Sequence, residues 1–178
     1  MKKALQLFAR EGYEGVSMRI LAEQVPIAPS VLYHHFKDKD ALLKELFDTV
    51  NTQLGVERAK LPEVKTAADM LRQRIEFQID HAEEIVAVLK YYLTYRDNFA
   101  ENTLGFIPEK GYLHILEVLD YGAETGEFVI HNREEDAKVI THAINGFLLE
   151  YYPHKPEARQ KADLVEIIYQ FIIRALKK

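Results

Sequence analysis

Apolar residues recur at three- and four-residue spacing along most of the chain, which places them on one face of an α-helix. No stretch shows the strict apolar–polar alternation of a half-buried strand. The sequence therefore predicts an all-α protein. The predicted helices cover residues 2–10, 18–24, 29–35, 39–54, 67–80, 83–97, 109–124, 133–152 and 156–177.

Polar and helix-breaking residues stand at the ends of these patterns. Ser17, Asp38, Thr66 and Asn132 precede apolar runs, where a short polar side chain can accept from the first free N–H groups of a helix. A glycine that follows a pattern can end a helix, a glycine within a pattern interrupts the apolar spacing, and a proline suits a first helical position. The positions concerned are Gly12, Gly122, Gly126 and Pro156.

Residues 17–39 hold two short helical patterns, which a break at Pro26-Ile27 separates. In the second pattern Leu32 and Phe36 are spaced to face inward, which leaves the polar and small residues facing outward. Two short helices joined by such a turn make a helix-turn-helix, whose second helix can enter a DNA major groove.

Around this motif stands the string ALQLF…GY…S…ILAEQ…I…S.LYHHFKDKDALL, which spans about the first 45 residues. It resembles the DNA-binding domain of the TetR family of transcriptional regulators. Pro26 and Ala28 depart from the family pattern, which commonly has Gly and a capping residue there. Family members also usually begin with a longer first helix.

The resemblance implies a three-helix DNA-binding domain over residues 1–47 and a helical effector-binding and dimerisation domain over residues 48–178. It implies a homodimeric repressor that a small-molecule effector releases from a palindromic operator in double-stranded DNA. The alternative is an effector-independent DNA-binding dimer, which would act as an activator or an architectural protein. Surplus apolar surface on the helices near 133–152 and 156–177 favours these two as the dimer interface.

The predicted DNA-binding residues lie on the first turn of the second helix, on the third helix and at the start of the fourth. By resemblance, the first group lies beside the DNA backbone and Tyr33 contacts a phosphate. Lys39, at the start of a predicted helix, would share a phosphate with the free N–H groups there. Arg19 and Lys39 could also be ordinary solvated charges, and His35 could be a packed aromatic. The full set is Ser17, Met18, Arg19, Ala28, Pro29, Ser30, Tyr33, His34, His35 and Lys39.

Aromatic residues of the C-terminal part could line a mostly apolar ligand pocket with a few polar groups, although aromatic stripes are more often plain core. No catalytic set, metal site or cofactor motif stands out, and His–Glu pairs at helical spacing occur often by chance. A helical enzyme or metal-binding protein remains the rival reading. The candidate pocket residues are Phe77, His81, Tyr91, Tyr92, Tyr95, Phe106, Tyr112, His142, Phe147 and Tyr151.

Composition adds little to this picture. The 178 residues carry a net charge of −5 and contain no cysteine. Residues 1–47, in contrast, hold seven Lys or Arg against six Asp or Glu, so the predicted DNA-binding part is close to neutral. No apolar run reaches the ~20 residues that span a bilayer, and we expect a cytoplasmic protein without a membrane partner.

Overall fold

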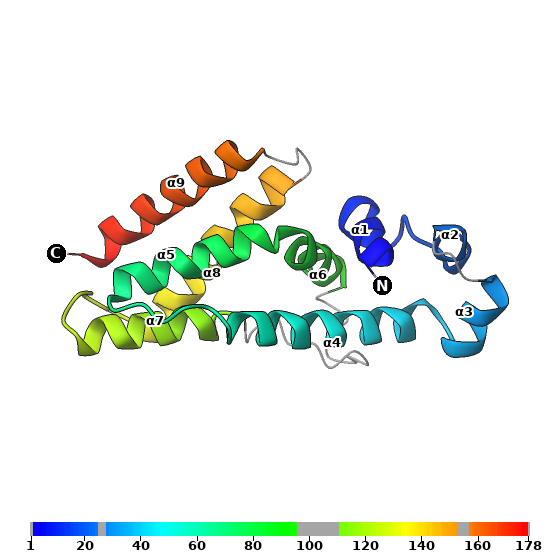
Figure 1. The fold of residues 1–178 in the computed structure, drawn as a ribbon, viewed down its shortest axis with the longest axis horizontal. Coiled ribbons are helices and arrows are strands. Elements are labelled where there is room, and N and C mark those ends of the chain that lie inside the picture. The colour runs from blue at the N-terminus through cyan, green and yellow to red at the C-terminus, as the bar shows by residue number, and fades with distance from the viewer. Residues whose placement is uncertain (1, 25–27, 96–110, 153–156, 178) are drawn as a thin grey trace. The chain divides into compact units, whose positions relative to one another are not determined.

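The computed structural model describes residues 2–24, 28–95, 111–152 and 157–177. These residues form α-helices and no strand, so the predicted all-α fold is confirmed (Figure 1). The helices are α1 (Lys2–Glu11), α2 (Met18–Gln24), α3 (Pro29–His35), α4 (Lys39–Arg58), α5 (Ala67–Asp80), α6 (Ala82–Tyr95), α7 (Leu113–Glu124), α8 (Arg133–Tyr151) and α9 (Ala158–Leu176).

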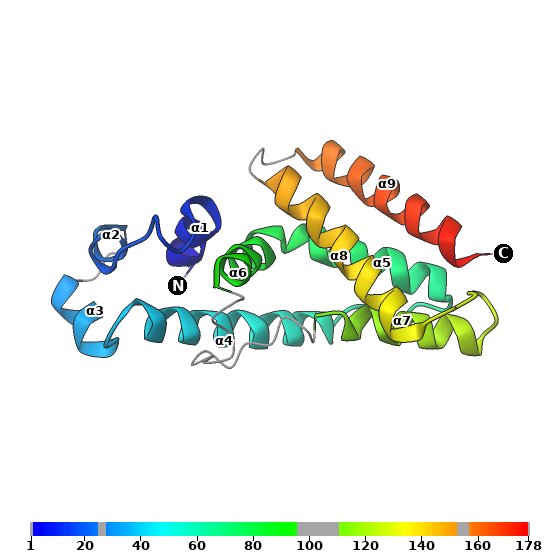
Figure 2. The ribbon, with the colours of Figure 1, turned by 180° about the vertical axis from the view of Figure 1, so that it is seen from behind.

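The helices fall into two compact units. The N-terminal unit contains α1 to α4 together with α6, and the C-terminal unit contains α5, α7, α8 and α9. In the C-terminal unit α8 and α9 run in opposite directions (Figures 1 and 2). This division follows packing within the chain, and the functional boundary near residue 47 stays a proposal.

Three of the predicted N-caps are confirmed. The Ser17 hydroxyl accepts from the Ile20 N–H at 3.2 Å, and the Asp38 carboxylate accepts from the Ala41 N–H at 2.8 Å. Thr66 accepts from the Asp69 N–H at 3.0 Å. Each bond satisfies an N–H group that the first helical turn leaves unpaired.

Gly12 ends α1 as predicted, because its backbone lies at φ +72°, which favours glycine. Gly126 adopts the same left-handed conformation after α7. Gly122 lies inside α7, which ends at Glu124 as predicted. A Cβ atom at Gly122 would come within 2.2 Å of the Phe128 ring, so this glycine makes room for a ring that packs against the helix.

Two predictions need correction. Asn132 makes no side-chain cap at α8, because Asp136 on that helix instead accepts from the N–H groups of His131 and Asn132, both at 3.0 Å. Helix α7 begins at Leu113, and residues 111 and 112 form a turn before it. The predictions at Pro26 and Pro156 fall outside the described residues.

Each unit has its own apolar core. In the N-terminal unit the buried side chains include Phe8, Val16, Leu21, Leu43 and Phe47, each at most 2% exposed. In the C-terminal unit they come from all four helices and are at most 1% exposed: Leu71, Ile75, Ile115, Leu119, Ile144 and Ile168.

Helix α6 is less buried than its apolar sequence predicts. Val86, Ala87 and Val88 are buried, but Leu93 is 50% exposed. The apolar pattern on nearly all sides of this helix led to the expectation of a central position. The structure shows that one part of its surface faces outward.

Candidate DNA-binding surface

The third helix of the chain presents one buried and several exposed positions. Leu32 points into the core at 4% exposure, while Val31 and Tyr33 beside it are 42% and 55% exposed. Ala28, Ser30, His34 and His35 are also exposed, whereas the turn at 25–27 and the Pro29 side chain lie outside the described residues. The predicted base-reading surface is therefore open to a partner wherever the structure describes it.

The start of α2 adds a second exposed group. Ser17 is exposed and caps the helix, and Met18 is half-buried. The Arg19 guanidinium is exposed and forms an ion pair with Glu23 one turn further along, at 3.0 Å. An exposed pair of this kind contributes little to stability, so the guanidinium can exchange Glu23 for a phosphate at small cost.

Lys39 differs from a solvated lysine. Its ammonium donates to the Tyr13 carbonyl oxygen at 2.9 Å and lies 3.5 Å from the centroid of the Tyr13 ring. A lysine in the first turn of a helix is electrostatically unfavourable, and these contacts offset that cost. The Tyr13 hydroxyl in turn donates to the Asp40 carboxylate.

Tyr13 belongs to an aromatic cluster inside the N-terminal unit. Its ring meets Tyr91 of α6 edge to face, with centroids 5.3 Å apart, and Tyr91 meets Phe47 of α4 at 5.6 Å. Burial, with a smaller effect of Asp40, raises the pKa of Tyr91 to about 12. Tyr13 is therefore a packed aromatic, in contact with α4 and α6.

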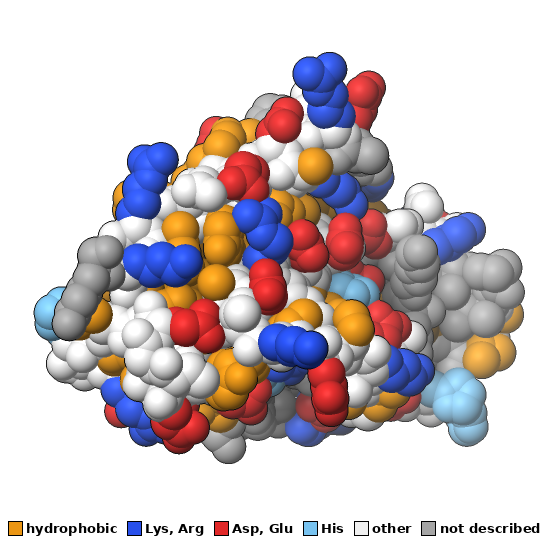
Figure 3. Space-filling view, turned by 60° about the vertical axis from the view of Figure 1, so that its left-hand side comes forward, with side chains coloured by type: hydrophobic (Ala, Val, Ile, Leu, Met, Phe, Trp, Pro, Cys, Tyr) orange, Lys and Arg blue, Asp and Glu red, His pale blue; other side chains and the backbone are white. Residues whose placement is uncertain are grey.

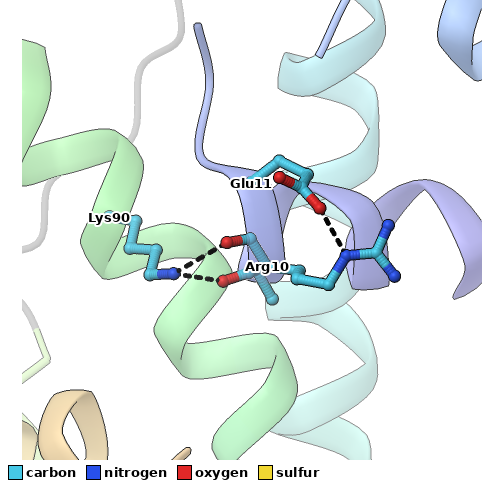
Figure 4. A network of polar contacts seen from close by, with 4 residues as sticks. Arg10, Glu11 and Lys90 are labelled. Atoms are coloured by element: carbon cyan, nitrogen blue, oxygen red, sulfur yellow. Dashed lines mark hydrogen bonds and ion pairs between the residues drawn. The ribbon is translucent and has the colours of Figure 1, made fainter. Parts of the chain in front are cut away.

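A second lysine joins α6 to α1. The Lys90 ammonium donates to the carbonyl oxygens of Ala9 at 2.6 Å and Arg10 at 3.3 Å (Figure 4). The last carbonyls of a helix have no partner within the helix, so this contact satisfies the end of α1. Arg10 itself pairs with Glu11.

The candidate pocket residues fall in both units. Tyr91 and Tyr92 lie on α6 in the N-terminal unit, and the side chain of Tyr95 and the whole of Phe106 lie outside the described residues. The remaining six, which lie in the C-terminal unit, are Phe77, His81, Tyr112, His142, Phe147 and Tyr151.

Within the C-terminal unit, the structure brings some of these residues together in pairs. Phe77 contacts His81 with ring centroids 4.4 Å apart, and Phe147 stacks with Tyr151 at 6.3 Å. His142 is exposed.

Two polar residues that sequence reasoning missed lie one turn apart on α5. Arg74 Nε and Gln78 Oε1 are buried and have no hydrogen-bond partner among the described residues. The other end of the Arg74 guanidinium lies 3.6 Å from a Glu117 carboxylate oxygen. Buried polar atoms without partners are costly, so a group that pairs with them would bind favourably. Only their helical spacing in the sequence could have suggested them.

Other kinds of site find no support in the described part of the chain. It contains no cluster of three or more His, Asp or Glu side chains arranged to hold a metal ion. None of its helices is long and apolar enough to cross a membrane.

The chain is similar to known regulators over its whole length. Residues 1–46 match the family model for bacterial regulatory proteins of the tetR family. The HTH-type transcriptional regulatory protein RaaS of Mycobacterium tuberculosis is 25% identical, and the match covers 98% of this chain and 80% of RaaS.

Solved structures share the fold. PfmR, a TetR family transcriptional regulator from Thermus thermophilus, superposes with a TM-score of 0.73 at 21% identity, over 99% of this chain and 98% of that one. FadR from Bacillus subtilis, in complex with stearoyl-CoA, gives 0.75 at 17% identity, over 98% and 96%.

These relatives and fold neighbours are named as transcriptional regulators, which favours a regulator over the rival enzyme. Three observations point to a DNA-binding regulator. They are the helix-turn-helix with its exposed third helix, the family match on that motif and the full-length similarity to regulators. Residues 1–46 thus match the family model of the tetR regulators, and the chain as a whole is similar to DNA-binding transcriptional regulators of that kind.

Proposed function

We propose that this chain is a homodimeric repressor, which acts in the cytoplasm and leaves a palindromic operator when a small-molecule effector binds its C-terminal domain. The exposed side of α3, opposite the buried Leu32, carries the proposal. In a dimer, two such helices would enter successive major grooves with centres about 34 Å apart.

The proposed contacts divide into two kinds. Ser17, Arg19, Tyr33 and Lys39 contact phosphates, which sets affinity and its salt dependence but carries no sequence information. Ser30 and His34 offer hydrogen bonds to base edges, and Ala28, Pro29 and Val31 offer apolar contact to thymine methyl groups. The predicted set contains no Arg or Asn for a bidentate base contact, so DNA shape should contribute to specificity.

The proposed dimer forms through α8 and α9. Ile167 and Phe171 lie one turn apart on α9 and are 55% and 68% exposed, and Val139 on α8 is 65% exposed. Large apolar side chains exposed at helical spacing are typical of an interface. Figure 3 shows one face of the molecule, on which apolar side chains lie between charged ones.

The proposed effector is an apolar or aromatic molecule with at least one hydrogen-bonding or anionic group. Arg74 and Gln78 support this choice, since their unpaired buried atoms offer one donor and one acceptor on the same side of α5. FadR, which has the same fold, was solved with stearoyl-CoA, a ligand that joins a long apolar chain to an anionic group.

Selection of bound sequences from a random or genomic DNA pool, at two salt concentrations, tests the proposal. We expect one palindrome whose binding weakens as salt rises. A small-molecule screen for release of that palindrome then tests the effector. Recovery of no sequence above background would contradict DNA binding, whereas an operator that no compound releases would favour the effector-independent regulator.

A further inference from the structure

Tyr13 contacts the ammonium of Lys39 through two neutral groups, its main-chain carbonyl and its ring. Its carbonyl oxygen accepts from Lys39 Nζ at 2.9 Å, and its ring lies beneath the same atom at 3.5 Å from the centroid. One residue of the loop between α1 and α2 therefore holds a lysine of α4 by two contacts. Neither a carbonyl nor an aromatic ring carries a net charge that would cancel that of the ammonium.

No carboxylate of the described residues lies within ion-pair distance of Lys39. Lys44, in the next turn of α4, pairs with Asp48 at 3.3 Å instead. The acidic neighbour of Lys39 in the sequence is Asp40, and its carboxylate accepts from the Tyr13 hydroxyl. Lys39 thus keeps its charge while its position is restricted.

The Tyr13 ring is itself anchored. Its hydroxyl is bound to Asp40, and its edge meets the ring of Tyr91 with centroids 5.3 Å apart. A long lysine side chain loses up to about 2 kcal/mol of rotamer freedom when it is held in one geometry. Holding the ammonium before DNA arrives moves this cost from binding to folding.

We propose that Tyr13 is a positioning residue for DNA binding, which holds the charged Lys39 ammonium ready for a phosphate without neutralising it. An ammonium has three N–H donors, and the Tyr13 carbonyl uses one of them. The inference rests on the proposed phosphate contact of Lys39.

The experiment measures operator affinity against salt concentration for the full-length protein, with the palindrome recovered by selection. Lys39→Ala removes one phosphate contact from each head, so the slope of log K against log salt should fall by about 1.8 per dimer. Tyr13→Leu should weaken binding roughly threefold to tenfold and reduce the slope in part. Tyr13→Phe keeps the ring and the carbonyl and should stay within about threefold of wild type.

A double variant separates positioning from general stability. In the Lys39→Ala background, Tyr13→Leu should cause no further loss of affinity, because the group it positions is gone. Lys44→Ala is the matched control, since it removes a lysine of the same helix that a carboxylate already neutralises, and the slope should not change. Equal losses from Tyr13→Leu in both backgrounds would overturn the inference.

An NMR measurement keeps the inference testable if Tyr13→Leu does not fold. In wild-type protein labelled with 13C-lysine, the ε-methylene protons of Lys39 should resonate upfield of other lysines, because they lie near the ring face. An unshifted signal would overturn the inference. If the wild-type protein binds no duplex, the proposed function is overturned as well. If the wild type binds its operator and the Tyr13 and Lys39 variants bind it equally well, this inference alone is overturned.

Discussion

The two units hold their interhelical cations in different ways. In the N-terminal unit, Lys39 and Lys90 donate to main-chain carbonyl oxygens of neighbouring elements. In the C-terminal unit, cations of one helix pair with carboxylates of another: Arg72 with Glu166, Arg74 with Glu117, Arg133 with Asp120 and Lys161 with Asp80.

The difference matters for the partner of each unit. A carboxylate cancels the charge of its cation, whereas a carbonyl oxygen leaves that charge in place. Lys39 therefore keeps its positive charge near the proposed DNA surface, although the whole chain carries −5. Local charge, and not the net charge, is what a phosphate meets.

The largest expected effect is on the small core of the N-terminal unit. Phe8 is 2% exposed, so Phe8→Ala should lower the free energy of unfolding by about 3–5 kcal/mol through lost burial and a cavity. Urea denaturation measures this change. The loss should not depend on protein concentration, and a change below about 1 kcal/mol would contradict the core assignment.

Substitution on the exposed apolar surface of the C-terminal unit should affect association of two chains and not the stability of one. Phe171 is 68% exposed, so Phe171→Glu should leave the fold of one chain intact but weaken the proposed dimer, by roughly 100-fold. Sedimentation velocity across a concentration series measures the dissociation constant. Val56→Glu, a charge at an exposed valine of α4, is the control and should leave the dimer unchanged.

The contrast between carbonyl and carboxylate partners can be tested directly with two lysines. Lys90→Met should cost about 1–2 kcal/mol, because it leaves the carbonyl oxygens of Ala9 and Arg10 without this donor. Lys161→Met should cost less than about 0.5 kcal/mol, because its pair with Asp80 spans 3.8 Å at the surface.

Denaturation in low and high salt then sharpens that test. The effect of Lys161→Met should vanish in high salt, which screens exposed charges, whereas the effect of Lys90→Met should persist. Equal salt dependence of the two would contradict the distinction between the units.

A modest effect is expected at Glu127, which caps α5 although it lies about 60 residues further along the chain. Its carboxylate accepts from the Ala67 N–H at 2.9 Å and the Ala68 N–H at 3.3 Å. These bonds lower the pKa of Glu127 below its ordinary value of 4.5, with the Ala67 bond the largest cause. Glu127→Gln should therefore cost about 0.5–1 kcal/mol at pH 7.

The sign of the pH dependence follows from the lowered pKa. The stabilisation by Glu127 is present above the unfolded pKa near 4.5 and is lost as pH falls through the folded value. The difference in unfolding free energy between wild type and Glu127→Gln should thus disappear in acid. Glu124→Gln, at an exposed glutamate of α7, should show no such difference at any pH.

The sequence predicted local features well because their causes are local. The helices at 18–24, 29–35 and 67–80 have the predicted bounds, since each follows from apolar spacing and a neighbouring cap. The DNA-binding candidates came from a motif and a resemblance, and their exposure on α3 agrees with that placement.

Contacts between distant residues could not be predicted in this way. Asn132 had the sequence of a cap, but Asp136 bonds to the main chain before α8 instead. Gly122 interrupts the apolar pattern in the sequence, and only the Phe128 ring packed against it explains why a glycine stands inside α7. The unpaired atoms of Arg74 and Gln78 emerge only once neighbouring helices bury them.

The sequence by itself determined the helical class, most helix ends and the helix-turn-helix, because periodicity and capping act over fewer than about ten residues. Only the tertiary structure decided that α6 packs with α1 and α4, that Lys90 closes the end of α1 and that Tyr13 holds Lys39. These contacts join residues 26 to 81 positions apart, and no local spacing encodes which side chains meet when the helices pack.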